Sequence, residues 1–155
     1  MQVANLRQYG SSRTVHGGTL TRPVRVPHRG GIMSVFTEAE LAFLQGERRL
    51  ARLATVGRDG TPHIAPVGWS LDEDATVGRI GGNDLRSTKK FRDVARTGRA
   101  AVVIDDVLPP FRPRGVEIRG RAVAVDGPEA LIVIHPERIV SWGLEGAPFS
   151  ARDVG

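Results

Sequence analysis

The chain has 155 residues, enough for one domain with a buried core, and it contains no apolar run long enough to span a membrane. It has no cysteine, which excludes disulfides, thiol nucleophiles, iron–sulfur clusters and cysteine-ligated zinc, and fits a reducing cytoplasm. The net charge of +5 lies wholly in residues 1–32, which hold five arginines and no acid, whereas basic and acidic residues balance in 33–155. The body of the chain therefore has no electrostatic reason to bind nucleic acid.

Residues 1–32 have no helical or strand period and are rich in Gly, Ser, Arg and Pro, which predicts a disordered basic extension before a domain at 33–155. The extension lacks the apolar core of a secretory signal, and its Arg-rich, acid-free composition resembles a transit peptide. A second interpretation rests on Arg29-Gly30-Gly31, because codons for these residues can spell a purine-rich ribosome-binding sequence. We hypothesise on this ground that translation starts at Met33; a native intact mass that begins at Gln2 would contradict it.

The first elements of the domain are a short helix and a hairpin. Thr37 and Glu40 have the spacing of a capping box at the start of a helix. The apolar run 50–56 predicts a strand, and a Gly-Arg-Asp-Gly turn at 57–60 connects it to a second strand over 63–71.

The second strand alternates in a way that defines two different faces. One face holds His63, Ala65, Val67, Trp69 and Leu71, and the other holds Ile64, Pro66, Gly68 and Ser70. Pro66 cannot donate to a ladder and Gly68 has no side chain to pack, so we predict that the strand is bulged, interrupted or at an edge. Two interpretations of the flat second face stay open: a planar ring approaches the backbone there, or the barrel bends without a ligand.

The rest of the domain reads as further strands and one helix. Three acids at 72–74 predict a solvated turn and no metal site, because no partner ligands lie nearby in the sequence. The expected elements are strands over 75–81, 99–104, 116–125, 131–134 and 138–144, a helix over 88–98 that buries Phe91, Val94 and Ala95, and a stiff loop with three prolines over 108–115. Six or seven hairpin-linked strands with two short helices predict a mainly β fold, a small antiparallel barrel.

The segment 81–94 places a glycine-rich turn, hydroxyls and cations at the start of a helix, directly after a strand. Unpaired backbone N–H groups and the positive end of the helix dipole favour an anion there. Lys89 and Lys90 add charge, and Ser87 and Thr88 add hydroxyl donors, which together predict a phosphate site. The alternative is a capped surface helix, because Ser87 is a good N-cap and lysines are usually solvated.

The sequence motifs of the common catalytic machineries are absent. There is no GxSxG elbow, Walker loop, GxGxxG fingerprint or HExxH helix. The histidines show no metal-ligand spacing, and only His63 points into the candidate site, where it either lines the pocket or donates a proton. Because no acid–base pair can be named, we expect a cofactor to carry any chemistry.

Three segments in a fixed order resemble a known family. They are Leu53–Val56 with its hairpin partner Asp59–Val67, then Ser87–Val94, then Arg99–Ile104. In this order they resemble the pyridoxamine 5′-phosphate oxidase-like (PPOX class) split β-barrel family, and most of all its actinobacterial branch that uses the deazaflavin coenzyme F420. The resemblance extends over residues 35–145.

The resemblance implies a homodimer with the cofactor bound at the subunit interface. The family's phosphate-binding lysine falls on Lys90, next to Lys89 and the hydroxyls of Thr88 and Ser87. The cofactor ring is implied to rest near His63, Ile64, Ala65, Pro66 and Val67, with Trp142 reaching it from the partner subunit.

The implied activity is hydride transfer from C5 of reduced F420 to a small organic acceptor. The F420 tail bears a phosphodiester and several glutamates, so it needs a longer cationic track than FMN, and Arg86, Lys89, Lys90 and Arg92 favour it. An FMN-dependent oxidoreductase of the same fold and a non-catalytic F420 carrier stay open as alternatives. The chain ends without the Arg-Leu-x-Pro segment of vitamin-B6 oxidases, so that activity is not implied.

Overall fold

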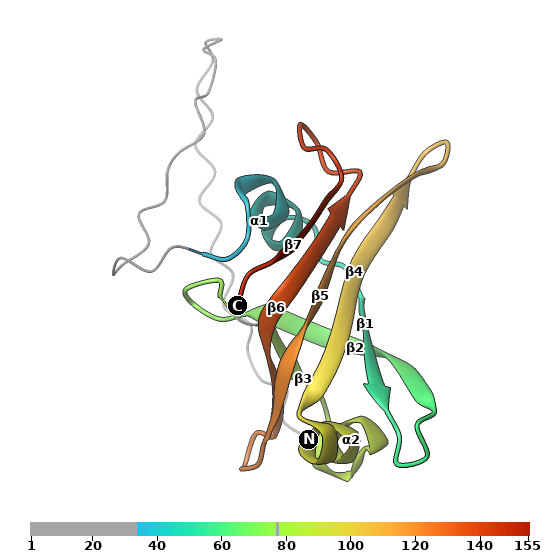
Figure 1. Cartoon of the computed structure of the whole chain (residues 1–155), viewed down its shortest axis with the longest axis vertical. Coiled ribbons are helices and arrows are strands. Elements are labelled where there is room, and N and C mark those ends of the chain that lie inside the picture. Colours follow the sequence, from blue (N-terminus) through green and yellow to red (C-terminus); the bar gives the residue numbers. More distant parts are fainter. Residues whose placement is uncertain (1–33, 77) are drawn as a thin grey trace, which may run out of the picture.

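A barrel of antiparallel strands forms the body of this computed structural model, which describes residues 34–76 and 78–155 (Figure 1). Within the described residues the strands are β1 (Ala51–Val56), β2 (Pro62–Leu71), β3 (Gly78–Gly81), β4 (Arg99–Leu108), β5 (Arg112–Val125), β6 (Leu131–Trp142) and β7 (Ser150–Asp153). They pair in the order β3-β2-β1-β4-β5-β6-β7, and a further β3–β6 pairing closes the first six into a barrel. The predicted mainly β barrel is confirmed, whereas the extension 1–32 lies outside the described residues.

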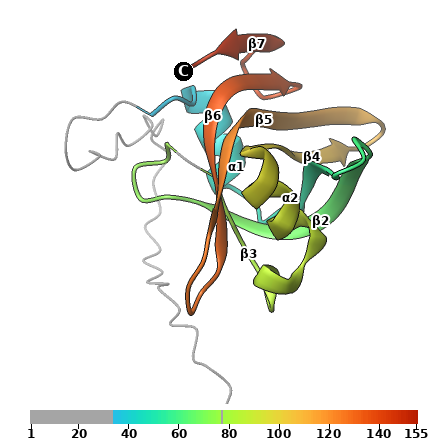
Figure 2. The ribbon, with the colours of Figure 1, turned by 60° about the horizontal axis from the view of Figure 1, so that its bottom comes forward.

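Two short helices lie at opposite ends of the barrel (Figures 1 and 2). Helix α1 (Glu38–Gln45) starts with the predicted capping box, in which the Thr37 hydroxyl accepts from Glu40 N and the Glu40 carboxylate accepts from Thr37 N. Helix α2 (Lys89–Thr97) follows a single 3₁₀ turn, η1 (Leu85–Ser87), and packs against β1 and β5. Both helices add apolar side chains to the barrel interior, which closes the core at each end.

Strand β2 changes its partner halfway along, which confirms the predicted edge character. Residues Pro62–Val67 pair with β1, and residues Gly68–Leu71 pair with β3. Each half of the strand therefore pairs with one neighbouring strand. Because Pro66 has a partner strand on one side alone, its missing N–H does not interrupt a ladder on both sides of the strand. The alternation is also confirmed, because Val67 is buried in the barrel while Ile64 is 73% exposed.

The predicted loop over 108–115 is wrong, because these residues form a hairpin. Strand β4 continues to Leu108, and β5 begins at Arg112 directly after the turn. A cross-strand ion pair holds the two ends together: Asp106 lies opposite Arg114 and accepts from its guanidinium at 2.6 and 3.0 Å. Arg49, from the segment before β1, donates to the same carboxylate at 2.6 Å.

The prediction of two strands, over 131–134 and 138–144, is also wrong. The chain over 131–142 is one strand, and a register shift opposite Arg119 and Gly120 leaves Glu137 as the extra residue of a bulge. A bulge tolerates a residue without an N–H, so Pro136 does not end the strand. Strand β7 was not predicted, and it pairs with β6 over Arg138–Ser141.

Two smaller differences concern the strand and helix on either side of the glycine-rich turn. Strand β3 begins at Gly78 and not at residue 75, because Ala75 has a positive φ of 50° in a turn that Asp72 stabilises by accepting from Thr76 N at 2.6 Å. In α2, Ala95 is exposed, and Asp93 is buried beside Phe91 and Val94 instead.

Replacement of Asp106 by asparagine is expected to reduce stability by about 1 kcal/mol at neutral pH. Hydrogen bonds from Arg114, and then from Arg49, lower the pKa of Asp106 to about 2. A lowered carboxyl pKa stabilises the fold above the ordinary pKa of 3.8, and this contribution is lost as the pH falls towards 2. Urea unfolding should show a gap between wild type and D106N at pH 7 that narrows in acid; a gap that is independent of pH would contradict this.

Asparagine at Asp105 is the matched control for this measurement. Asp105 pairs with Arg52, and both side chains are substantially exposed, so their pairing contributes little. We expect D105N to unfold at nearly the wild-type urea concentration.

Candidate functional site

The start of α2 uses its own hydroxyls to build the turn. The Thr88 hydroxyl accepts from Phe91 N at 3.3 Å as the N-cap and donates to the Leu85 carbonyl at 2.6 Å. The Ser87 hydroxyl donates to the Asp84 carboxylate at 2.5 Å, and Asp84 itself has a positive φ of 49°. Both hydroxyls predicted as phosphate donors are thus engaged in local hydrogen bonds.

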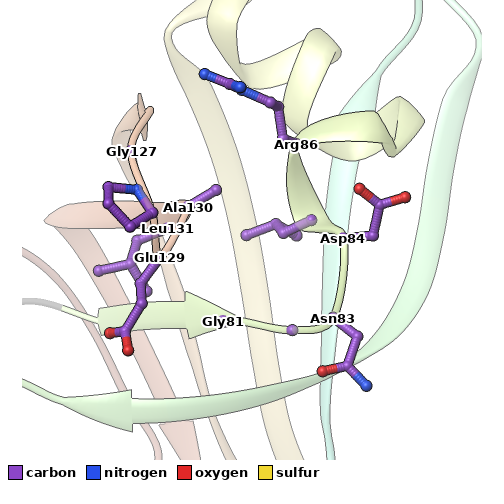
Figure 3. A pocket seen from close by; sticks show the side chains of 11 residues that line it. Gly81, Asn83, Asp84, Arg86, Gly127, Glu129, Ala130 and Leu131 are labelled. Carbon is purple, nitrogen blue, oxygen red and sulfur yellow. The ribbon is translucent and has the colours of Figure 1, made fainter.

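The glycine-rich turn borders a cavity whose lining includes neither Lys89 nor Lys90. The cavity has a volume of about 590 Å³ and is lined by residues 81–86 and by residues 127–131 of the β5–β6 turn. Figure 3 shows the Arg86 side chain and the Glu129 carboxylate pointing to different sides of it. Arg86 pairs with Asp126, which holds the pKa of that carboxyl below its usual range. The cavity has carboxylates of Asp84 and Glu129 in its lining, so it is poorly suited to a phosphate.

Lys89 and His63 come together at the turn of the β1–β2 hairpin. A β-carbon placed on Gly57 would lie 2.9 Å from His63 Nε2, 2.9 Å from Asp59 Oδ1 and 3.0 Å from Lys89 Nζ. The tips of three polar side chains therefore converge on a position that only glycine leaves open. This cluster joins the hairpin to the first turn of α2.

Asp93 is the residue of this cluster that the sequence did not suggest. Its side chain accepts from Thr55 Oγ1 at 3.2 Å and from Lys89 Nζ at 3.3 Å, and Arg96 lies 3.7 Å away. Burial raises the pKa of Asp93, but the hydrogen bonds from Lys89 and Thr55 and the charges of Lys89 and His63 bring it below its ordinary value. The spacing of four between Lys89 and Asp93 is the sequence signal that predicts this pair.

Lys90 differs from the other three cations of the predicted track. Arg86 pairs with Asp126, Lys89 with Asp93, and Arg92 donates to the Ser87 carbonyl at 2.5 Å. Lys90 is half-buried as a residue, and no hydrogen bond or ion pair within residues 34–76 and 78–155 engages its ammonium. Its charge is therefore available to an anion.

The structure divides the five residues expected beneath a cofactor ring. Ile64 and Pro66 lie on the outer face of β2, whereas the side chains of His63, Ala65 and Val67 lie on the other face. Gly68 continues the outer face, and no atom of the described residues, its two chain neighbours aside, lies within 4 Å of a β-carbon built on it. A flat group can thus rest against Ile64, Pro66 and Gly68, while Val67 is only 5% exposed.

Within one chain, the fold does not bring Trp142 to residues 63–67 of β2, where the cofactor ring is expected. It ends β6 opposite Gly115, where a β-carbon on the glycine would lie 2.6 Å from Trp142 Cζ2. That end of β6 lies near α1, and α2 lies at the other end of the barrel (Figure 1).

Two further features concern residues 34–76 and 78–155 alone. Among these residues, no three His, Asp or Glu side chains lie close enough to hold a metal ion. No helix among them is long and apolar enough to cross a membrane.

Comparison with solved structures identifies the same fold in several proteins. A heme-binding protein from Mycobacterium smegmatis matches 76% of this chain with a TM-score of 0.59 and 17% identity, and the chain spans 58% of that protein. A conserved hypothetical protein from Mycobacterium tuberculosis matches 77% of this chain and 94% of its own, with a TM-score of 0.59 and 21% identity. At these identities the likeness shows the fold alone.

Comparison with characterised sequences finds a relative with an activity. The 5a,11a-dehydrotetracycline/5a,11a-dehydrooxytetracycline reductase of Streptomyces rimosus is 40% identical over 133 residues, which cover 77% of this chain and 93% of the reductase. The family model described as pyridoxamine 5′-phosphate oxidase matches residues 36–148. Together with the reductase relative, this match supports an oxidoreductase. The chain belongs to the pyridoxamine 5′-phosphate oxidase family.

Proposed function

We propose that this protein is an F420-dependent reductase that works as a homodimer on a polycyclic conjugated ketone. The observation that carries the proposal is the unpaired ammonium of Lys90 at the start of α2, on a barrel whose β2 presents an open, flat outer face. The residues therefore fit a long planar cofactor with an anionic tail. The reductase from Streptomyces rimosus supports the acceptor class.

The chain's own residues would bind and orient the cofactor. Lys90 would bind the phosphate, and Ile64, Pro66 and Gly68 would support one side of the ring and exclude water from it. When bound, reduced F420 supplies a hydride from its C5. Because His63 lies in the Gly57 cluster, on the side of β2 away from that outer face, its position does not favour donation of a proton to a product on that face.

Reduction of a conjugated carbon–carbon double bond adds a hydride to one carbon and a proton to its neighbour, and leaves the cofactor oxidised. The protein's main contribution would be to hold the two reacting carbons close together, since orientation alone lowers such barriers by several kcal/mol. No general acid among the described residues is required if water supplies the proton.

A second copy of the chain would complete the site. The outer face of β1 and β4 carries small apolar side chains, and it borders a shallow cavity of about 440 Å³ lined by Ala54, Val56, Pro62 and Ala101. Arg99, Arg119 and Arg138 surround this cavity. An exposed apolar face with a charged rim is typical of a protein interface.

The test is a fluorescence titration of the full-length protein with F420 and, in parallel, with FMN. We expect F420 to bind at least about tenfold more tightly than FMN. Preference for FMN would assign the protein to the flavin-dependent members of the fold, and binding of neither would refute the proposal. Addition of 5a,11a-dehydrotetracycline to the reduced complex should restore the absorption of oxidised F420; binding without turnover would indicate a carrier.

A further inference from the structure

The barrel opens where β2 changes partner. Beyond Val67 the strand leaves β1 to pair with β3, while the segment between α1 and β1 continues in another direction. The space between them is a cleft of about 820 Å³, lined by residues 44–50 on one side and 67–72 on the other. This volume lies in the range of small-molecule sites.

Apolar side chains form part of the cleft walls, and the rest includes the carboxylates of Glu47 and Asp72, which already contact Arg49 and Thr76. Leu50 is 55% exposed although it is a large aliphatic residue, and Leu44 and Val67 form buried parts of the wall. The Trp69 indole donates to the Arg49 carbonyl at 2.9 Å, which connects the two walls. A half-buried indole fixed by its own hydrogen bond is a suitable platform for a flat ring system.

Two adjacent arginines of the cleft have different roles. The Arg49 guanidinium donates to Asp106 at 2.6 Å and to the Phe43 carbonyl at 2.8 Å, and it stacks 4.0 Å from the Phe43 ring. Arg48 is exposed and lines the cleft, and no ion pair or hydrogen bond within the described residues engages it. Arg48 is thus available to an anionic group of a bound molecule.

The cleft and the outer face of β2 share Gly68, and the cleft lining also includes Trp69 from the opposite face of the strand. Gly68 lines the cleft and also shares the outer face with Ile64 and Pro66, and the space above it is open. A ring resting on that face and a molecule in the cleft would therefore meet at Gly68. This step rests on the proposed function, because it takes the ring to be the hydride donor.

We propose that this cleft is the acceptor site and that it takes a polycyclic molecule with an ionised 1,3-dicarbonyl group, the chemistry of the tetracycline nucleus. Arg48 binds the ionised oxygens, and Leu50 and Trp69 flank the rings. Arg48 is then a specificity-determining residue, since an uncharged acceptor of the same shape gains nothing from it.

The test uses the full-length protein and oxytetracycline as the probe, with tryptophan fluorescence as the readout. Saturable quenching is expected in the wild type, and Trp69→Phe should remove most of the quenching because the other tryptophan, Trp142, lies outside the cleft. Arg48→Glu should weaken oxytetracycline binding at least about tenfold and leave F420 binding unchanged. The matched control is Arg112→Glu, an exposed arginine at the β4–β5 turn, which should change neither.

The outcomes separate this inference from the proposed function. If F420 binds but oxytetracycline does not, or if Arg48→Glu binds oxytetracycline as the wild type does, the cleft is not the acceptor site while the proposed cofactor stands. If Arg48→Glu changes the oligomeric state in size-exclusion chromatography instead of the affinity, the cleft is a subunit contact and the inference is overturned. Failure of the wild type to bind F420 refutes the proposed function, and the oxytetracycline titration still judges the cleft by itself.

Discussion

Replacement of Arg152 by alanine is expected to lower the free energy of unfolding by about 3 kcal/mol. Arg152 in β7 donates to both oxygens of Glu40 at 2.7 Å and to the Val35 carbonyl at 2.8 Å. The Glu40 side chain is 1% exposed, so the substitution leaves a buried carboxylate without its charged partner. The same carboxylate also caps α1, and the loss should therefore loosen both α1 and β7.

Urea unfolding measures this loss, and Arg138→Ala is the matched control. Arg138 of β6 pairs with Asp153 of β7, but both side chains are well exposed, and we expect a loss below about 1 kcal/mol. Equal losses for the two variants would show that the burial of Glu40 does not matter.

The pH dependence gives a second check on the same pair. Burial raises the pKa of Glu40, but the hydrogen bond from Arg152 and those from Thr37 and Ser141 together bring it below the ordinary 4.5. The stabilisation is therefore present above pH 4.5 and is lost as the pH falls through the lowered pKa. The difference between wild type and R152A should narrow in acid.

Replacement of Lys90 by alanine is expected to weaken F420 binding by about 30-fold, the loss of one charge-assisted hydrogen bond to a phosphate. Lys89→Ala is the matched control on the adjacent position. Because Lys89 already pairs with the buried Asp93, we expect about a threefold effect or less from its removal. A larger effect at Lys89 than at Lys90 would assign the phosphate to the Gly57 cluster instead.

The lysine content of the chain allows a direct readout of this assignment. Lys89 and Lys90 are its only lysines, so reductive ¹³C-methylation, which keeps the charge, introduces two side-chain NMR signals besides the amino terminus. Titration with F420 should shift the Lys90 signal more than the Lys89 signal. If neither signal moves while fluorescence reports binding, the start of α2 is not the phosphate site.

The features that the sequence predicted correctly depend on neighbours a few residues apart. The capping box of Thr37 and Glu40, the hairpin at 57–60 and the two faces of β2 all arise from local hydrogen bonding and strand alternation. The order of these elements also carried the family resemblance, which the family match confirms. For the same reason the helix beginning at Lys89 was predicted, although its buried Asp93 was not.

The features that only the tertiary structure decided depend on residues far apart in the chain. Arg152 fixes β7 through Glu40, 112 positions away, and Arg49 reaches Asp106 across 57 positions to extend the β4–β5 hairpin. The same folding gave Arg86 and Lys89 different partners and opened the cleft between residues 44–50 and 67–72. Local periodicity reports which side of an element is apolar, but only the closed barrel determines which distant charge that element meets.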